Sequence, residues 1–153
     1  MSNTQTNTSE QDEQKFKEWS QSEYVKISKF CNSKGYQIKK IDQPKCQLLA
    51  PIVAIWYVKT TEANLNLWVI SGDFPTDLTD AKVANNARQS LRHFSMAWHM
   101  QAAKLEEGVA SGRIELQDAE TQTKFANELT HRAENLYKLY SDEGLWAASG
   151  QQA

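Results

Sequence analysis

Residues 68–77 read Trp68-Val69-Ile70-Ser71-Gly72-Asp73-Phe74-Pro75-Thr76-Asp77. The apolar run at the start of this stretch predicts a buried β-strand, because it is short and rich in aromatic and β-branched side chains. Gly72 and Pro75 predict a sharp turn, since glycine adopts backbone angles that other residues resist and proline ends a central strand. The turn is acidic, and we expect it to lead straight into a long helix.

A second strand is predicted just before this stretch. Residues 52–58 (Ile-Val-Ala-Ile-Trp-Tyr-Val) are apolar on both faces, which is typical of a central strand covered by helices. The connection over residues 60–64 is too short for a parallel crossover, so the two strands should pair antiparallel. Residues 36–41 could add a short edge strand.

Three amphipathic helices complete the expected elements. Apolar residues recur at helical spacing over residues 11–34, 80–107 and 118–140. Thr79 or Asp80 is the expected N-cap of the middle helix. The fold class predicted from this order is α+β, with a small antiparallel sheet of two or three strands. An N-terminal helix and a C-terminal helical hairpin should cover that sheet.

The chain length fits one domain. With 153 residues, we expect a single α+β domain over residues 11–146. Residues 1–10 are polar and should form a disordered tail, and residues 147–153 should fray.

Composition argues against several classes of partner. The net charge of −2 is too close to neutral to favour nucleic acid or an anionic membrane surface. The sequence contains no apolar stretch of membrane-spanning length and no signal peptide. Cys31 and Cys46 match no metal-ligand spacing and are expected to be reduced thiols. We therefore expect a cytoplasmic protein without a cofactor.

One residue breaks the apolar stripe of the first predicted helix. Glu23 lies within that stripe, between Ser20 and Ile27. Either it sits near the end of the contact and reaches water, or it is a paired and partly buried carboxylate. An unpaired buried charge would be costly, so the second interpretation requires a partner.

The acidic turn allows two interpretations. Asp73, Asp77 and Asp80 precede the predicted helix, where negative charge is favoured by exposed N–H groups and the helix dipole. Capping and steric effects can therefore account for every residue of the turn. Alternatively, Asp73 and Asp77 could hold a cation or a cationic ligand, although the dense oxygen-ligand pattern of a calcium loop is lacking.

A polar stripe follows on the long predicted helix. Arg88, Arg92, Ser95 and His99 share one side of that helix. In one interpretation the arginines form ion pairs that pin the turn and helix together. In the other they grip a carboxylate or phosphate, with His99 as a possible proton-transfer group.

The opposite side of the same helix is less polar than a solvated surface. His93, Met96 and Met100 lie there. Another part of the chain, a second copy or a recruited protein could cover this face. The three histidines do not converge on one metal, no nucleophile motif is present, and we predict neither a metal site nor a catalytic residue.

Three segments resemble a family of uncharacterised proteins from marine and other gammaproteobacteria. They are residues 49–56, residues 68–77 with the motif Trp-Val-Ile-Ser-Gly-Asp-x-Pro-Thr-Asp, and residues 87–98. The family is known by a domain-of-unknown-function label. The resemblance therefore implies a lineage and a compartment but assigns no activity and no catalytic residue.

Two functions follow as hypotheses. The first is a non-enzymatic binding or protein-interaction module, which fits the lack of a catalytic motif and the methionine-containing face. Its partner could be an unknown protein or a second copy of the chain. The alternative is a small-molecule binder or enzyme with a site formed by Asp73, Asp77, Arg88, Arg92 and His99 at the strand-to-helix turn.

Overall fold

The computed structural model describes residues 3–113 and 116–149 of the chain. The chain separates into two compact units, Met1–Lys82 and Val83–Ala153. The sequence predicted one domain over residues 11–146, and nothing in local composition marks the division, because the segment between the units contains no typical linker.

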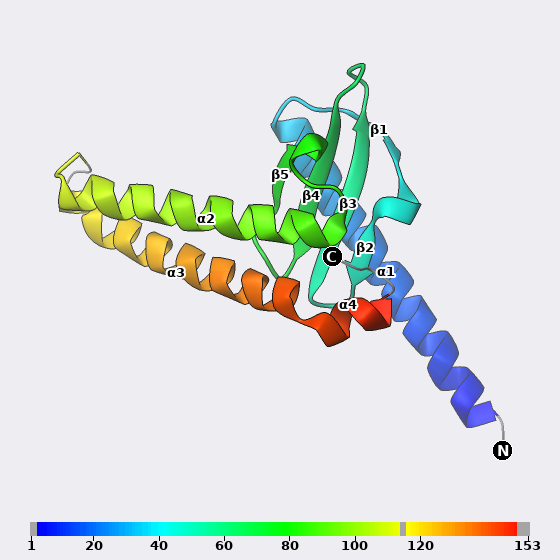
Figure 1. Cartoon of the computed structure of the whole chain (residues 1–153). Helices are drawn as coiled ribbons and strands as arrows, with labels where there is room; N and C mark the ends of the chain where they lie inside the picture. The colour runs from blue at the N-terminus through cyan, green and yellow to red at the C-terminus, as the bar shows by residue number, and fades with distance from the viewer. Residues whose placement is uncertain (1–2, 114–115, 150–153) are drawn as a thin grey trace. The chain divides into compact units, whose positions relative to one another are not determined.

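The first unit combines one long helix with a five-stranded antiparallel sheet (Figure 1). Its helical segments are α1 (Asn3–Ser33) and the short 3-10 helices η1 (Gln43–Lys45) and η2 (Ala81–Val83), the last of which crosses the unit boundary. Its strands are β1 (Ile38–Ile41), β2 (Gln47–Leu49), β3 (Val53–Thr60), β4 (Asn66–Gly72) and β5 (Asp77–Asp80).

Strand β3 is the centre of this sheet. It pairs with β4 along its length, with Trp56 opposite Val69, and this antiparallel pairing confirms the sequence prediction. On its other edge, β1 and β2 pair with successive halves of β3. The predicted count of two or three strands is wrong, because β2 and β5 are too short to carry a periodic signal.

The connection between β4 and the long helix also differs from the prediction. After the turn the chain forms β5, an edge strand that pairs with β4, with Asp77 opposite Ile70. Asp80 is the last residue of this strand, and its side chain accepts a 2.9 Å hydrogen bond from the Lys82 N–H in η2, so it does not cap the long helix. Asp80 suits both roles, because Asp is a common helix N-cap and a charged side chain on an edge strand resists further pairing.

Helix α1 packs on one face of the sheet. Ile27 and Cys31 are fully buried against a face of β3 and β4 that includes Trp56 and Val69. The helix begins at Asn3, whereas the sequence predicted a disordered tail through residue 10. Adding a residue to an existing helix costs far less than nucleating one, so weak helix formers can extend it.

The second unit is helical. It contains α2 (Ala87–Ala110), α3 (Leu116–Ser141) and α4 (Glu143–Ser149), and α2 and α3 pack against each other as the predicted hairpin (Figure 1). Helix α2 begins seven residues later than predicted. Its N-cap is Asn86, whose side chain accepts a 2.8 Å hydrogen bond from the N–H of Gln89.

Buried polar contacts connect the helices of the second unit. The Ser95 hydroxyl on α2 donates to the carbonyl of Ala133 on α3 at 2.8 Å. Trp146 of α4 is fully buried, and its indole N–H donates to the Leu139 carbonyl at 2.8 Å. Helix α4 continues to Ser149, so residues 147–149 are helical, and the rest of the segment predicted to fray, residues 150–153, lies outside the described residues.

Candidate functional site

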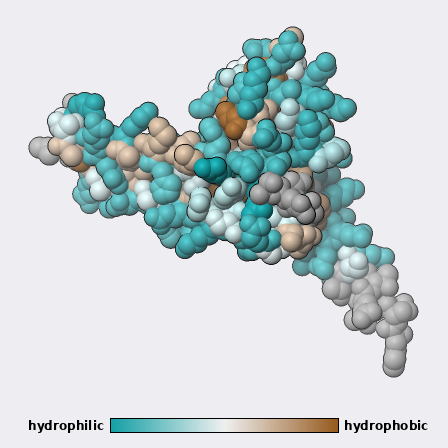
Figure 2. All heavy atoms as spheres, in the orientation of Figure 1, coloured by the Kyte–Doolittle hydropathy of each residue, from teal (hydrophilic) through white to brown (hydrophobic). Residues whose placement is uncertain are grey.

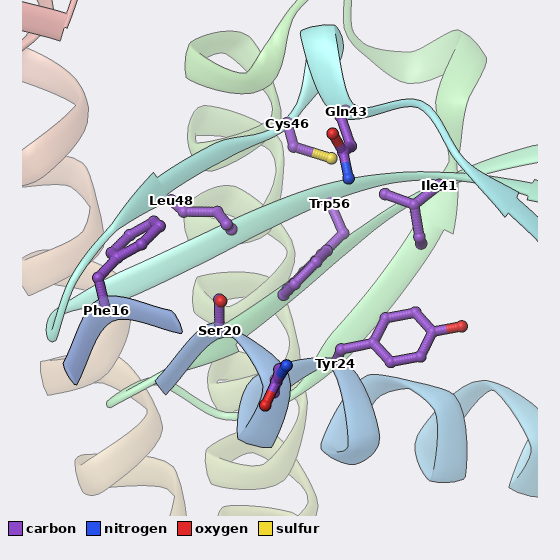
Figure 3. A pocket seen from close by; sticks show the side chains of 9 residues that line it. Phe16, Ser20, Tyr24, Ile41, Gln43, Cys46, Leu48 and Trp56 are labelled. Carbon is purple, nitrogen blue, oxygen red and sulfur yellow. The ribbon is translucent and has the colours of Figure 1, made fainter. Parts of the chain in front are cut away.

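A cavity of about 600 Å³ opens in the first unit between α1 and the β1–β3 part of the sheet (Figure 3). Its described lining consists of three aromatic side chains, three aliphatic or sulfur-containing ones and three polar uncharged ones. These are Phe16, Tyr24 and Trp56; Ile41, Leu48 and Cys46; and Ser20, Gln21 and Gln43. Such a volume is typical of small-molecule sites, which are largely apolar with a few polar groups.

The most buried aromatic residue of the cavity lining is Trp56. Its side chain comes from β3 on the face that carries α1, and only 6% of the residue is exposed. The indole N–H donates a 3.2 Å hydrogen bond to the hydroxyl of Ser71, the neighbouring residue on this face of β4. The Tyr24 ring on α1 lies 6.1 Å from the Trp56 ring, tilted by 59°.

Behind Trp56 lies the buried carboxylate of Glu23. It accepts hydrogen bonds from the Gly72 N–H and from the Lys26 ammonium, both at 2.9 Å, and it is also hydrogen-bonded to the Ser71 side chain. Lys26 in turn donates to the Gly72 carbonyl at 3.4 Å. Of the two interpretations of Glu23, the structure shows the paired and buried one.

The charge of Glu23 is stabilised by these donors. Burial by itself raises the pKa of the carboxyl, but the hydrogen bonds from Lys26, Ser71 and Gly72 and the Lys26 charge together lower it below its ordinary value. Glu23 is therefore ionised at neutral pH and accepts rather than donates. In this state it holds α1, the end of β4 and the Ser71 hydroxyl together.

Gly72 has to be glycine at this junction. Its φ is +102°, and a Cβ there would lie 2.6 Å from the Ile52 carbonyl oxygen and 2.8 Å from the Val53 Cα. The close approach exists because Gly72 is paired with Val53 across the two strands. The sequence predicted the turn, but its steric reason is a contact with a residue far away in the chain.

Cys46 is a structural thiol in the cavity wall. Its sulfur accepts a 3.3 Å hydrogen bond from the Tyr57 N–H and donates to the Asp42 carbonyl at 3.4 Å. Burial raises the pKa of this thiol, the Tyr57 hydrogen bond opposes the effect, and the Asp42 charge adds to it. The thiolate is thus disfavoured, which argues against Cys46 as a nucleophile.

The two acids of the predicted turn both belong to the first unit. Asp73 is exposed, and its N–H donates to the Ile52 carbonyl at 2.9 Å. Asp77 opens β5, and its side chain accepts a 2.8 Å hydrogen bond from the Leu78 N–H. The turn therefore connects β4 to β5, so the expected capping of the long helix by these acids is wrong, and the cation-binding alternative stays a prediction.

The basic members of the predicted site belong to the second unit. Arg88 is buried; its Nε donates to the Tyr140 carbonyl at 3.0 Å, and its Nη2 donates to Glu143 at 2.9 Å. Arg92 and His99 on the same helix are exposed. Whether these residues meet Asp73 and Asp77 in one site stays a prediction.

The predicted contact face of α2 is partly exposed to solvent. Met96 is 53% exposed and Met100 is 60% exposed, while His93 is half-buried. Figure 2 shows apolar residues along the helical hairpin among hydrophilic neighbours. Exposed methionines provide an adaptable apolar surface.

The described residues contain neither a metal-ligand cluster nor a helix that could span a membrane. Among residues 3–113 and 116–149, no group of three or more His, Cys, Asp or Glu side chains is placed to hold a metal ion. Within the same part of the chain, no helix combines the length and the apolar character that a membrane crossing requires.

Comparison with protein families gives one match. The family model described as Domain of unknown function (DUF4826) matches residues 13–146. The chain belongs to the DUF4826 family. The match includes residues of both compact units. No curated protein and no solved structure matches the chain.

Sequence reasoning missed the cavity of this DUF4826 protein. The cavity is lined by Trp56 and not by Trp68, because Trp68 pairs with Tyr57 and lies on the opposite face of the sheet. The signal that could have led to the site is Glu23. A carboxylate within an apolar stripe indicates a buried partner. Here one partner is the Gly72 N–H, and the residue before it, Ser71, is hydrogen-bonded to the cavity residue Trp56.

Proposed function

We propose that this DUF4826 protein is a non-enzymatic binding module whose binding site is the cavity of the first unit. The observation that carries the proposal is a cavity of about 600 Å³ lined by three aromatic side chains and a small number of polar groups. Its titratable lining residues are Tyr24 and Cys46, and the raised pKa of the Cys46 thiol argues against nucleophilic chemistry.

The test uses a neutral solvatochromic dye, Nile red, and two matched tryptophan variants. Ser20 lines the cavity, whereas Ser22 is exposed on the same helix and does not line it. We expect Ser20→Trp to weaken dye binding by about tenfold or more, because a bulky side chain fills the site. Ser22→Trp should bind the dye like the unaltered protein.

A second variant distinguishes a blocked cavity from a misfolded protein. Gln43 is exposed and lines the opposite wall of the cavity, so Gln43→Trp should also reduce dye binding while leaving the melting temperature unchanged. Binding of dye to the unaltered protein that neither Ser20→Trp nor Gln43→Trp reduces would place the dye elsewhere and overturn the proposal.

A second candidate function is protein interaction through the α2 face defined by His93, Met96 and Met100. The exposure of both methionines favours it, since side chains of this kind form adaptable contacts. We place either function in the cytoplasm, because both cysteines are free thiols and a reducing compartment keeps them so.

The alternative enzyme or small-molecule site at the strand-to-helix turn has less support. Its most buried member, Arg88, already uses Nε and both terminal nitrogens on Tyr140 and Glu143. A guanidinium engaged in this way has few donors left for a ligand.

A further inference from the structure

The indole of Trp56 is oriented before any ligand arrives. Its single polar atom, the N–H, is bound by Ser71, which does not line the cavity. Ser71 is itself hydrogen-bonded to the ionised Glu23 carboxylate. The chain from Glu23 through Ser71 to Trp56 fixes the ring, so that its apolar atoms form the part of the residue that lines the cavity. A preorganised ring reduces the entropic cost of binding.

Two further aromatic rings extend this surface. Phe16 is 43% exposed and Tyr24 is 41% exposed, although both lie on the side of α1 that borders the cavity (Figure 3). In this view Phe16 and Tyr24 lie on opposite sides of Trp56. A planar aromatic ligand would cover apolar area on all three, and aromatic rings add favourable offset or edge contacts.

The cavity wall offers no charge to a ligand. All nine of the described lining residues have side chains that are uncharged at neutral pH. Two carboxylates adjoin lining residues in sequence. Glu23 is engaged by Gly72 and Lys26, and Asp42 is paired with the Lys45 ammonium at 3.9 Å. An ionised ligand would lose hydration on entering without gaining a counter-charge, and this is costly.

Three lining residues can form hydrogen bonds with a ligand. Ser20 and Gln21 on α1 and Gln43 on η1 carry hydroxyl or amide groups that both donate and accept hydrogen bonds. These groups suit an amide, a hydroxyl or a ring nitrogen on the edge of a ligand.

We propose that the cavity binds an uncharged, planar aromatic small molecule that stacks on Trp56 and carries a hydrogen-bonding group toward Ser20, Gln21 or Gln43. This rests on the proposed function, in which the cavity is the binding site. It adds the chemical class of the ligand and assigns Ser71 as the residue that positions the indole.

The test compares probes of one shape and different charge. Naphthamide is neutral, naphthoate is an anion and naphthylmethylammonium is a cation at neutral pH. We expect naphthamide to bind at millimolar concentration or below, with upfield ring-current shifts of its own protons, and both ions to bind about tenfold or more weakly. The saturated, neutral decalin carboxamide should also bind more weakly than naphthamide, because it cannot stack.

Ser71→Ala tests the positioning role. The variant removes the acceptor of the Trp56 N–H but leaves every lining residue in place. We expect weaker naphthamide binding, smaller ring-current shifts and a moved indole N–H resonance of Trp56. Nile red binding, which depends mainly on apolar volume, should change less. If Ser71→Ala lowers stability but leaves the ring-current shifts of bound naphthamide unchanged, Ser71 has a purely structural role. That result would overturn its assignment as a positioning residue.

The two proposals fail in different ways. If naphthoate, naphthylmethylammonium or decalin carboxamide binds as tightly as naphthamide, and Ser20→Trp abolishes that binding, the ligand class is wrong while the cavity remains the site. If Ser20→Trp affects neither Nile red nor any naphthalene probe, or none of these compounds binds the unaltered protein, the proposed function falls and the ligand class with it.

Discussion

The Glu23 carboxylate on α1 accepts a 2.9 Å hydrogen bond from the backbone N–H of Gly72 at the end of β4. The two residues are 49 positions apart in the chain. This bond places a charged group at the interface of helix and sheet, where Ser71 connects it to the indole of Trp56. It therefore contributes to the fold of the first unit and to the shape of the cavity wall.

Glu23→Gln should make stability less dependent on pH. Because the folded-state pKa of Glu23 lies below its ordinary value of 4.5, the charged form stabilises the protein above about that pH. This contribution is lost as the pH falls through the lowered folded-state pKa. We expect the variant to lose about 1–3 kcal/mol at neutral pH, measured by urea unfolding, and the difference from the unaltered protein to shrink in acid.

The matched control for this change is Glu13→Gln, an exposed carboxylate on the same helix. It should leave the unfolding free energy within about 0.5 kcal/mol at neutral pH. A Glu23→Gln difference that stays constant from neutral to acidic pH would show that the lost contribution does not come from the ionised carboxylate.

Gly72→Ala should be far more damaging than Gly35→Ala. Both glycines have positive φ, +102° and +89° respectively, so both substitutions carry backbone strain. Only at Gly72 does the new Cβ also meet backbone atoms, at 2.6 and 2.8 Å, while nothing lies within 4 Å at Gly35. We expect a loss of about 1 kcal/mol at Gly35 and about 3 kcal/mol or more at Gly72, by thermal or urea unfolding. Equal losses at the two positions would contradict the steric account.

Arg88→Lys should destabilise the second unit, although it keeps the charge. The Arg88 side chain is 4% exposed, and its planar group bonds the Tyr140 carbonyl and Glu143 while lying 5.4 Å from the Tyr140 ring and 5.6 Å from the Trp146 ring. Lysine cannot reproduce this fork of donors, and we expect a loss of about 2–4 kcal/mol in the free energy of unfolding.

Arg92→Lys serves as the control for Arg88, since Arg92 lies one turn later on α2 and is exposed. It should change stability by less than about 0.5 kcal/mol. The tryptophan fluorescence of Arg88→Lys provides a second measurement, because loosening of α4 would expose the buried Trp146 to water. If Arg88→Lys is as stable as the unaltered protein, the positive charge is sufficient for stability and the planar donor geometry of the guanidinium is not required.

The double variant Met96→Glu, Met100→Glu tests the second candidate function. Both side chains are more than half exposed, so the melting temperature should change little. If this face holds a second copy of the chain, sedimentation should show the mass falling to that of the monomer, because two carboxylates cannot be buried in an apolar contact. An unchanged mass, together with unchanged captured partners, would exclude the face as an interface.

The sequence by itself determined the elements whose signals are local. The apolar run around Ile55, the strand that ends at Gly72 and the helical stripe containing Leu91 and Trp98 all appear where periodicity predicts them. Their positions follow from side-chain spacing along the chain, which needs no knowledge of distant partners. The antiparallel pairing of β3 and β4 was predictable for the same reason, because a short connection allows no other arrangement.

Tertiary structure decided everything that depends on residues far apart in sequence. The short strands β2 and β5 exist because β3 and β4 offer them free edges. Glu23 is buried because Gly72, Ser71 and Lys26 converge on it, and the cavity forms where α1 meets the edge of the sheet. Local sequence contains the propensity of each residue, whereas a buried charge, a steric demand for glycine and a cavity arise from non-local packing.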